Sequence, residues 1–428
     1  MKAGLHTVLP SSSIGSALVL GLFNQAVVSI GGFGWNLALA RGLPADEYGV
    51  IALITAIILY LNGLHQALIT YPLSLDAASG DSREFSRSRI VAALSTLLFQ
   101  FVCIPAVVIV TARNAPLKAL PLALVALFFW QIQEINRRSA LARGLYLEAT
   151  CGDAVRYLGA FAVAAILAVN GLLSVQAAFL VVALASALAL LATPSTAFSW
   201  VRFGPLNFAA EIKSYWRRGS PVLWAALLSA FPVTFFLWLL VRKDGLVAGA
   251  AFQALLNIAA IARPVAVGIE NMLVPEIARR KGTMSFHELV SILWHCAWVS
   301  GALIVPVFAV ILLAPQWTLG LFYGSDAPYT RFPGELRILI WVYVTYPIAA
   351  IFSATLKAYG ASEGLMKMQL YPALTAVILG PFLILRMGLL GACLTWLATG
   401  LVCTLFGLLY VTRLRRFTSS RGTIRQAV

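Results

Sequence analysis

The sequence predicts an all-α, polytopic membrane protein with twelve transmembrane helices in two six-helix bundles. Three observations predict this fold class. Hydrophobic residues make up 61% of the 428 residues and charged residues only 11%, whereas about a quarter of a soluble chain is charged. Twelve apolar runs approach the roughly 20 residues that a bilayer-spanning helix needs. The two halves of the chain also share turn markers that indicate an internal repeat.

The twelve apolar runs follow one another with short connections. The first six cover residues 14–40, 49–68, 90–110, 120–135, 155–169 and 172–191. The second six cover residues 221–241, 247–268, 289–313, 336–356, 369–385 and 389–411. The fourth and fifth runs are short, so we expect their helices to extend into the cytoplasm through residues 134–138 and 153–156. No extramembrane domain fits between the runs, and the activity is therefore expected within the membrane.

The basic residues predict the orientation. If Met1 lies in the cytoplasm, most of the 31 Lys and Arg residues fall in cytoplasmic tails and loops. Arg156 and Arg337 are each the second residue of a run, and Arg263 alone lies well inside one. Lys and Arg are retained on the cytoplasmic side during insertion, so both termini are predicted inside. This bias explains most of the net charge of +15, and no nucleic-acid partner is expected. The first run is too long for a signal peptide and is expected to be the first span.

A parallel repeat is predicted from turn glycines that recur in both halves. Gly49 and Gly249 each follow an arginine at the start of a run, and Gly171 and Gly388 lie in matching tight turns. Six crossings per half give both halves the same orientation, which is a usual frame for alternating access. The predicted divisions are a first lobe (1–198), a cytoplasmic linker (199–218), a second lobe (219–412) and a basic cytoplasmic tail (413–428).

Three stretches carry a resemblance to a known superfamily. Residues 37–49 (LALARGLPADEYG) resemble the first hairpin of polysaccharide exporters in the multidrug/oligosaccharidyl-lipid/polysaccharide (MOP) flippase superfamily. Residues 271–279 (NMLVPEIAR) resemble the end of their eighth helix, and residues 388–392 (GLLGA) the start of their last helix. The resemblance extends over nearly the whole chain in length, span count and repeat. It implies a MATE-like, two-lobed bundle with a central cavity.

Within this superfamily the chain looks most like the Wzx-type branch. That resemblance implies a flippase that moves undecaprenyl-diphosphate-linked oligosaccharides across the bacterial inner membrane for exopolysaccharide or O-antigen-type export. The implied partners are the lipid-linked substrate, membrane lipids and polysaccharide polymerase or glycosyltransferase machinery. Drug antiporters of the superfamily often carry a carboxylate in the first helix, where this chain has Asn24, Gln25 and Asn36. This departure argues against cation-coupled drug export.

Arg263 is the leading candidate for substrate binding. Charges inside spans are costly and are functional hypotheses by default. A guanidinium in a watery cavity offers charge and a bidentate fit to diphosphate oxygens. The alternative is an ion pair with Glu270, which lies seven residues further along the same helix face.

Other polar groups within the runs complete the candidate set. Arg41 is a candidate for holding diphosphate at the outer mouth, against the alternative of a cation at a helix C-terminus. Glu134 and Glu270 are candidates for ion coupling, although Glu134 is also placed to pair with Arg138. Neutral hydrogen-bonding groups suited to sugar hydroxyls, or to ordinary contacts between helices, are Asn24, Gln25, Gln253 and Asn257.

Two further classes of function stay open. One is a small-molecule antiporter of the same superfamily, coupled to a cation. The other is a membrane-embedded polymerase or glycosyltransferase, which the short outer loops disfavour. No Walker motif or nucleophile elbow is present in the sequence, so we expect a transporter and not an enzyme. The five cysteines lie mostly inside apolar runs, and neither a metal site nor a cofactor is expected.

Overall fold

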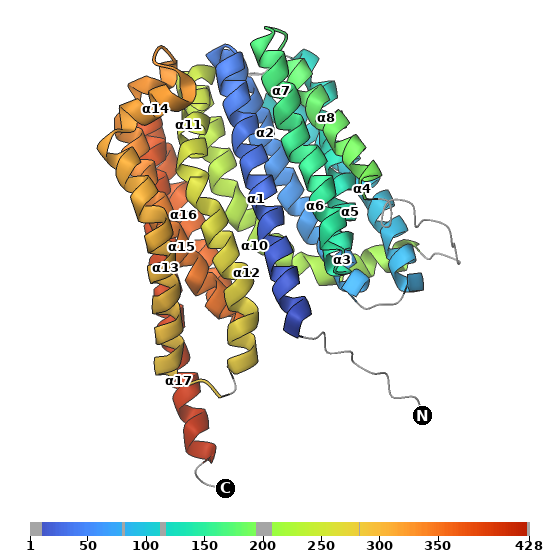
Figure 1. Cartoon of the computed structure of the whole chain (residues 1–428), viewed down its shortest axis with the longest axis vertical. Helices are drawn as coiled ribbons and strands as arrows, with labels where there is room; N and C mark the ends of the chain where they lie inside the picture. The colour runs from blue at the N-terminus through green and yellow to red at the C-terminus, as the bar shows by residue number, and fades with distance from the viewer. Residues whose placement is uncertain (1–10, 79–81, 112–116, 194–207, 282, 426–428) are drawn as a thin grey trace.

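The structure, a computed structural model, describes residues 11–78, 82–111, 117–193, 208–281 and 283–425. These residues form a bundle of long helices without a strand (Figure 1). Each predicted apolar run lies mostly within a helix. Eight of the described helical segments are long and apolar enough to cross a membrane, and Val175–Leu191 is a shorter apolar helix. The all-helical class is confirmed, while twelve crossings and two cytoplasmic termini stay predictions.

The first half of the chain folds into rods that include two π-helical turns. η1 (Gln66–Thr70) joins α2 to α3, and η3 (Ala154–Leu158) joins α6 to α7. π turns are rare and often mark functional sites. The helices of this half are α1 (Ser11–Gly42), α2 (Ala45–His65), α3 (Tyr71–Ala78), α4 (Ser82–Thr111), α5 (Leu120–Ala142), α6 (Tyr146–Asp153), α7 (Gly159–Val169) and α8 (Val175–Leu191), with a 3₁₀ turn η2 (Leu117–Ala119) before α5.

The second half begins earlier than expected. Residues 208–218, part of the predicted linker, already belong to α10, and residues 199–207 lie outside the described residues. Most of the predicted tail is likewise helical, as the end of α17. The helices are α10 (Phe208–Asp244), α11 (Leu246–Ala259), α12 (Arg263–Arg280), α13 (Phe286–Leu313), α14 (Pro315–Tyr323), α15 (Pro333–Tyr359), α16 (Ser362–Met387) and α17 (Leu389–Arg425), with 3₁₀ turns η4 (Ala260–Ala262) and η5 (Pro328–Arg331).

Local sequence sets several helix boundaries. Gly171 and Gly388, the matched turn glycines, have φ of 66° and 58°, a conformation that side chains with a Cβ rarely adopt. The Ser174 hydroxyl accepts a hydrogen bond from the third residue of its helix and caps α8. Ser285 and Glu288 form a reciprocal capping box at the start of α13.

The helices form two groups that meet along α2. Helices α1–α8 pack mainly against one another, as do α10–α17, and α2 lies against α10 and α11 between the groups. We call the groups the N-lobe and the C-lobe. The hairpin end of the bundle carries the turn between α1 and α2, and the termini end is opposite (Figure 1). At the hairpin end Gly49 permits close approach, because a Cβ there would lie 2.1 Å from the Leu246 carbonyl oxygen.

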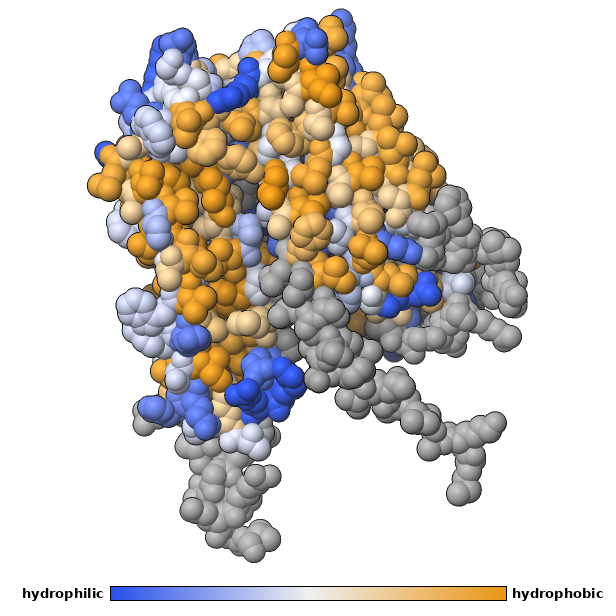
Figure 2. All heavy atoms as spheres, in the orientation of Figure 1, coloured by the Kyte–Doolittle hydropathy of each residue, from blue (hydrophilic) through white to orange (hydrophobic). Residues whose placement is uncertain are grey.

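The flank of the bundle is apolar on the outside. Val169, Leu313 and Ile378 are 89%, 83% and 69% exposed. Figure 2 shows hydrophobic residues over the flank and hydrophilic residues gathered toward the two ends. Exposed apolar surface on this scale suits contact with lipid and not with water.

Candidate functional site

The eighth predicted run is broken near its middle. α11 ends at Ala259, one 3₁₀ turn follows, and α12 starts at Arg263. Pro264 has no N–H to donate and is favoured in the first turn of a helix, so the sequence explains the new start. The Arg263 side chain is exposed and lies near Tyr343 of α15. Among the described residues it has neither a hydrogen bond nor an ion pair.

Glu270 does not pair with Arg263. Its carboxylate accepts a hydrogen bond from the Lys357 ammonium and one of 3.4 Å from the Ser353 hydroxyl, both on α15. The alternative interpretation of Arg263, an ion pair along α12, is therefore absent from the structure. The arginine stays available to a ligand, and the carboxylate is held by the neighbouring helix.

A buried polar network occupies the N-lobe around Asp153. This carboxylate is fully buried and accepts hydrogen bonds from three helix-borne donors: Arg137 Nε at 2.6 Å, Asn24 Nδ2 at 2.7 Å and Gln133 Nε2 at 3.3 Å. The contacts join α1, α5 and α6. Asn24 is thus committed to the interior of the lobe, because its amide serves Asp153.

Glu134 belongs to the same network. It is 5% exposed and accepts from Arg138 at 2.7 Å and from Arg137 at 3.3 Å, so the predicted pairing with Arg138 is present. Gln66, in the π turn η1, donates a longer bond of 3.5 Å. The helices continue through residues 134–138 and 153–156, as predicted, and their place in the cytoplasm stays a prediction. The lobe buries most of these residues, which is possible because their charges are paired.

Arg156, in the π turn η3, is the most enclosed cation of the network. It is 3% exposed and donates to the side-chain oxygen Oε1 of Gln133 at 2.6 Å. Its guanidinium lies 4.0 Å from the centre of the Trp130 ring and 4.6 Å from that of Tyr157. Aromatic faces stabilise a buried guanidinium by cation–π attraction.

The other predicted amides have ordinary contacts. Gln25 donates to Ser29 one turn along its own helix, at 3.4 Å. Asn257 reaches the Phe33 carbonyl oxygen and the Tyr323 hydroxyl, both at 3.5 Å, and so links the lobes. Gln253 is half-buried and has no hydrogen bond among the described residues.

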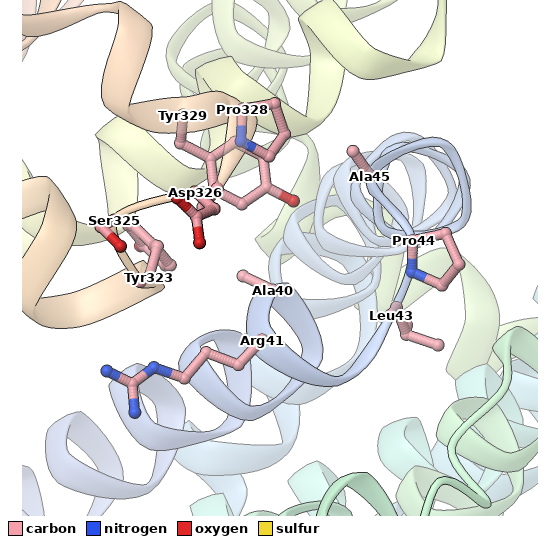
Figure 3. A pocket seen from close by; sticks show the side chains of 12 residues that line it. Ala40, Arg41, Leu43, Pro44, Ala45, Tyr323, Ser325, Asp326, Pro328 and Tyr329 are labelled. Atoms are coloured by element: carbon pink, nitrogen blue, oxygen red, sulfur yellow. The ribbon is translucent and has the colours of Figure 1, made fainter.

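At the hairpin end Arg41 joins the two lobes. Its Nε and Nη2 donate to the carbonyl oxygens of Phe322 and Leu321, at 2.5 and 2.6 Å. These carbonyls lie in the last turn of α14, where no residue of the helix itself can serve them. Arg41 therefore caps a helix of the other lobe, whereas the predicted alternative placed it at the C-terminus of its own helix. Figure 3 shows its side chain extended past the loop that carries Ser325 and Asp326.

A cleft of about 400 Å³ lies between Arg41 and this loop. The turn between α1 and α2 forms one wall, and Tyr323, Asp326 and Tyr329 contribute to the other (Figure 3). Behind it, Tyr329 contacts both Tyr323 and Tyr48 of α2 in edge-to-face pairs. The lobes are therefore closed against each other at the hairpin end.

At the termini end the first turns of α10 belong with the N-lobe. Arg218 forms an ion pair with Asp76 of α3, and Glu211 pairs with Arg87 of α4 at 2.8 Å. Tyr215 is buried against Ser88, and burial raises the pKa of its phenol. By contrast, α1 and α12, which face each other on the other side, meet at only a few residues. The interface between the lobes is thus asymmetric.

Sequence reasoning missed four charged members of these clusters: Arg137, Asp153, Arg156 and Lys357. Arg137 and Asp153 were expected at the membrane edge, because each lies just beyond a short apolar run. The available signal was composition: two carboxylates and three arginines in two neighbouring helices can neutralise one another. Lys357 gave no signal, because a lysine after an apolar run is the ordinary mark of a cytoplasmic boundary.

Comparison with known proteins identifies the fold. A protein-family model, MatE, matches residues 221–382. An inward-facing multidrug resistance MATE family transporter of the MOP superfamily has 16% identity and a TM-score of 0.67, over 92% of this chain and 96% of its own. An outward-facing transporter of that description has 14% identity and a TM-score of 0.64, over 95% and 96%.

A third solved structure is a MOP superfamily transporter from Pyrococcus furiosus, described as having a binding pocket of reverse polarity that suggests a different function. It has 15% identity and a TM-score of 0.64, over 95% of this chain and 97% of its own. No curated protein matches the chain. At these identities the comparisons show the fold alone: the chain has the fold of MATE family transporters.

Proposed function

We propose that this protein is a flippase that moves an undecaprenyl-diphosphate-linked oligosaccharide from the cytoplasmic to the periplasmic leaflet of the bacterial inner membrane. The observation that carries the proposal is Arg263, an exposed guanidinium without a protein partner at a break in the middle of a membrane helix. Phosphates crossing bare hydrocarbon lose their hydration at a cost of many kcal/mol. A guanidinium in an aqueous path offsets part of that cost with two parallel hydrogen bonds.

The mechanism follows from the asymmetric interface. We take the termini end as cytoplasmic and the hairpin end as periplasmic. The Arg41 cap and the tyrosine cluster close the periplasmic side, so the headgroup first reaches Arg263 from the cytoplasm. The isoprenoid tail stays in lipid beside α1 and α12, which meet at only a few residues. Gln25, Gln253 and Asn257 supply hydrogen bonds for sugar hydroxyls, and rocking of the lobes then opens the hairpin end.

A cation-coupled drug antiporter is the second proposal, favoured by the fold that the chain shares with multidrug transporters. Coupling requires a carboxylate that can take up and release a cation. Asp153 is held by the half-buried Arg137, Glu134 by Arg137 and Arg138, and Glu270 by Lys357. The first helix offers Asn24 in place of a carboxylate. These pairings favour the flippase. A polymerase or glycosyltransferase is the least favoured function.

The test is flipping of a fluorescent undecaprenyl-diphosphate-linked saccharide in proteoliposomes. We expect Arg263→Ala to slow flipping by about 30-fold, since a hydrogen bond to a charged group contributes about 2 kcal/mol, and Arg263→Lys to retain part of the activity. Arg280→Ala, on the same helix but paired with Glu276, serves as the control. Flipping by Arg263→Ala at the wild-type rate contradicts the proposal. Export of a cationic dye that needs an imposed ion gradient, without lipid flipping, supports the antiporter.

A further inference from the structure

The seam between α12 and α15 carries a row of polar side chains. On α15, Tyr343, Tyr346, Ser353 and Lys357 recur at helical spacing along one face. Arg263 lies near Tyr343, and Glu270 contacts Ser353 and Lys357. Both helices run from the hairpin end toward the termini end, so the row runs the same way. Of the two helices, α12 lies beside α1 of the N-lobe, and the two meet at only a few residues.

Most other cationic side chains at the termini end of the C-lobe are paired with nearby protein groups. Arg279 and Arg280 pair with Glu276 on their own helix. Lys281 donates to the carbonyl oxygen of Ala358 at the end of α15. Lys357 differs, because its side chain is 43% exposed and its partner Glu270, 30% exposed, comes from another helix of the row. Exposure leaves room for a third group to approach both.

We propose that Lys357 is a second anion-binding residue for the phosphorylated headgroup of a membrane lipid, and that the Glu270 carboxylate holds it in place until a phosphate displaces that carboxylate. The inference rests on the proposed function and deepens it. Lys357 lies nearer the termini end than Arg263, so the headgroup meets the lysine first. Glu270 is seven residues from Arg263, about 10 Å along α12.

Charge balance supports two cations. Each phosphate of a diphosphate that links a lipid to a sugar carries one negative charge near pH 7, so the single positive charge of Arg263 leaves the diphosphate undercompensated. An exposed Lys–Glu pair is weak, contributing at most about a factor of five in an equilibrium constant. A phosphate with several acceptor oxygens therefore competes well for the ammonium. Once displaced, the Glu270 carboxylate repels the anion and favours its passage toward Arg263.

The experiment measures binding of undecaprenyl diphosphate to the full-length protein in nanodiscs by native mass spectrometry, for wild type, Lys357→Gln and Glu270→Gln. Lys357→Gln should weaken binding about tenfold, the size of a charged hydrogen bond. Glu270→Gln should tighten binding about threefold, because the competing charge is gone. The matched control is the exposed pair Lys367–Glu363 on α16, whose Lys367→Gln and Glu363→Gln variants should leave binding unchanged.

The outcomes separate this inference from the proposed function. Failure of the wild-type protein to bind the lipid refutes both. Wild-type binding that Lys357→Gln and Glu270→Gln leave unchanged refutes only the role of Lys357. A structural ion pair predicts that Glu270→Gln lowers Tm and does not tighten binding, which also refutes the inference. Inorganic diphosphate is the second probe. If this ion binds at Lys357 as strongly as the lipid does, Lys357 is a site for free anions, and a lipid-headgroup site is refuted.

Discussion

Removal of Arg41 should open the hairpin end. The guanidinium donates two hydrogen bonds to carbonyl oxygens of α14, across the boundary between the lobes. Arg41→Ala deletes both bonds and leaves the last turn of α14 to water. The carbonyls lose little when water replaces the arginine, so the main effect is on the balance between closed and open forms and not on folding.

The size of the effect follows from the two bonds. A hydrogen bond to a charged group contributes about 1.5–3 kcal/mol when shielded, but Arg41 is exposed, and exposure lowers such contributions to about 0.2–1 kcal/mol each. The cation at the C-terminal end of α14 adds about 0.3–1 kcal/mol. The total is about 1.5 kcal/mol, which changes the ratio of closed to open forms by about tenfold. Arg41→Lys should change it less, because one ammonium keeps the charge.

The assay is the distance between spin labels at Val169 and Leu313, exposed residues at the hairpin end of different lobes, in a background without the native cysteines. Arg41→Ala should add a longer distance to the distribution. Arg386→Ala is the control. The Arg386 guanidinium lies over Phe382 of its own helix, and no contact of this side chain with the N-lobe is found among the described residues. A distribution for Arg41→Ala that matches the control refutes the argument that Arg41 holds the lobes together.

Three other substitutions test the packing. Gly49→Ala should lower Tm and lengthen the same label distance, because its Cβ collides with the Leu246 carbonyl oxygen of the other lobe and overpacking costs about 1–3 kcal/mol. Gly249→Ala should lower Tm alone, since its collision lies within one lobe. Asp153→Ala should cost about 3 kcal/mol in the free energy of unfolding, measured by denaturation in detergent, because it removes the main partner of the half-buried Arg137; a change below about 0.5 kcal/mol contradicts the network.

Apolar run length predicted most of the fold, because lipid imposes a simple rule on every span. The rule describes a single helix in hydrocarbon and takes no account of contacts with neighbouring helices. Residues 134–138 and 153–156 show the limit: as isolated segments they belong in water, yet α5, α6 and α1 neutralise one another and remain in the interior. Pairing between helices is a property of the packed lobe, so no single run reveals it.

The candidate site divides in the same way. Arg263 was predicted because it breaks the pattern of its own run, and the structure leaves it exposed. Lys357 sits at a boundary where lysine is expected, so its contact with Glu270 across two helices could be found only after folding. At such boundaries a positive charge can fix the topology or bind an anionic substrate, so the sequence alone does not distinguish the two roles.

The pairing of Asp153, Glu134 and Glu270 bears on the source of energy. A coupling proton or metal cation would have to displace Arg137 from Asp153, and Arg137 would then keep only its longer contact with Glu134. Loss of the main partner of a charge inside the lobe is destabilising. Glu270 is the more accessible acceptor. A cation that binds there releases the Lys357 ammonium, and the two positive charges then repel each other. On the proposed function, removal of the flipped substrate by polymerisation in the periplasm supplies direction without an ion. The arginine network would then act as a fixed internal charge that holds the N-lobe rigid while the lobes rock.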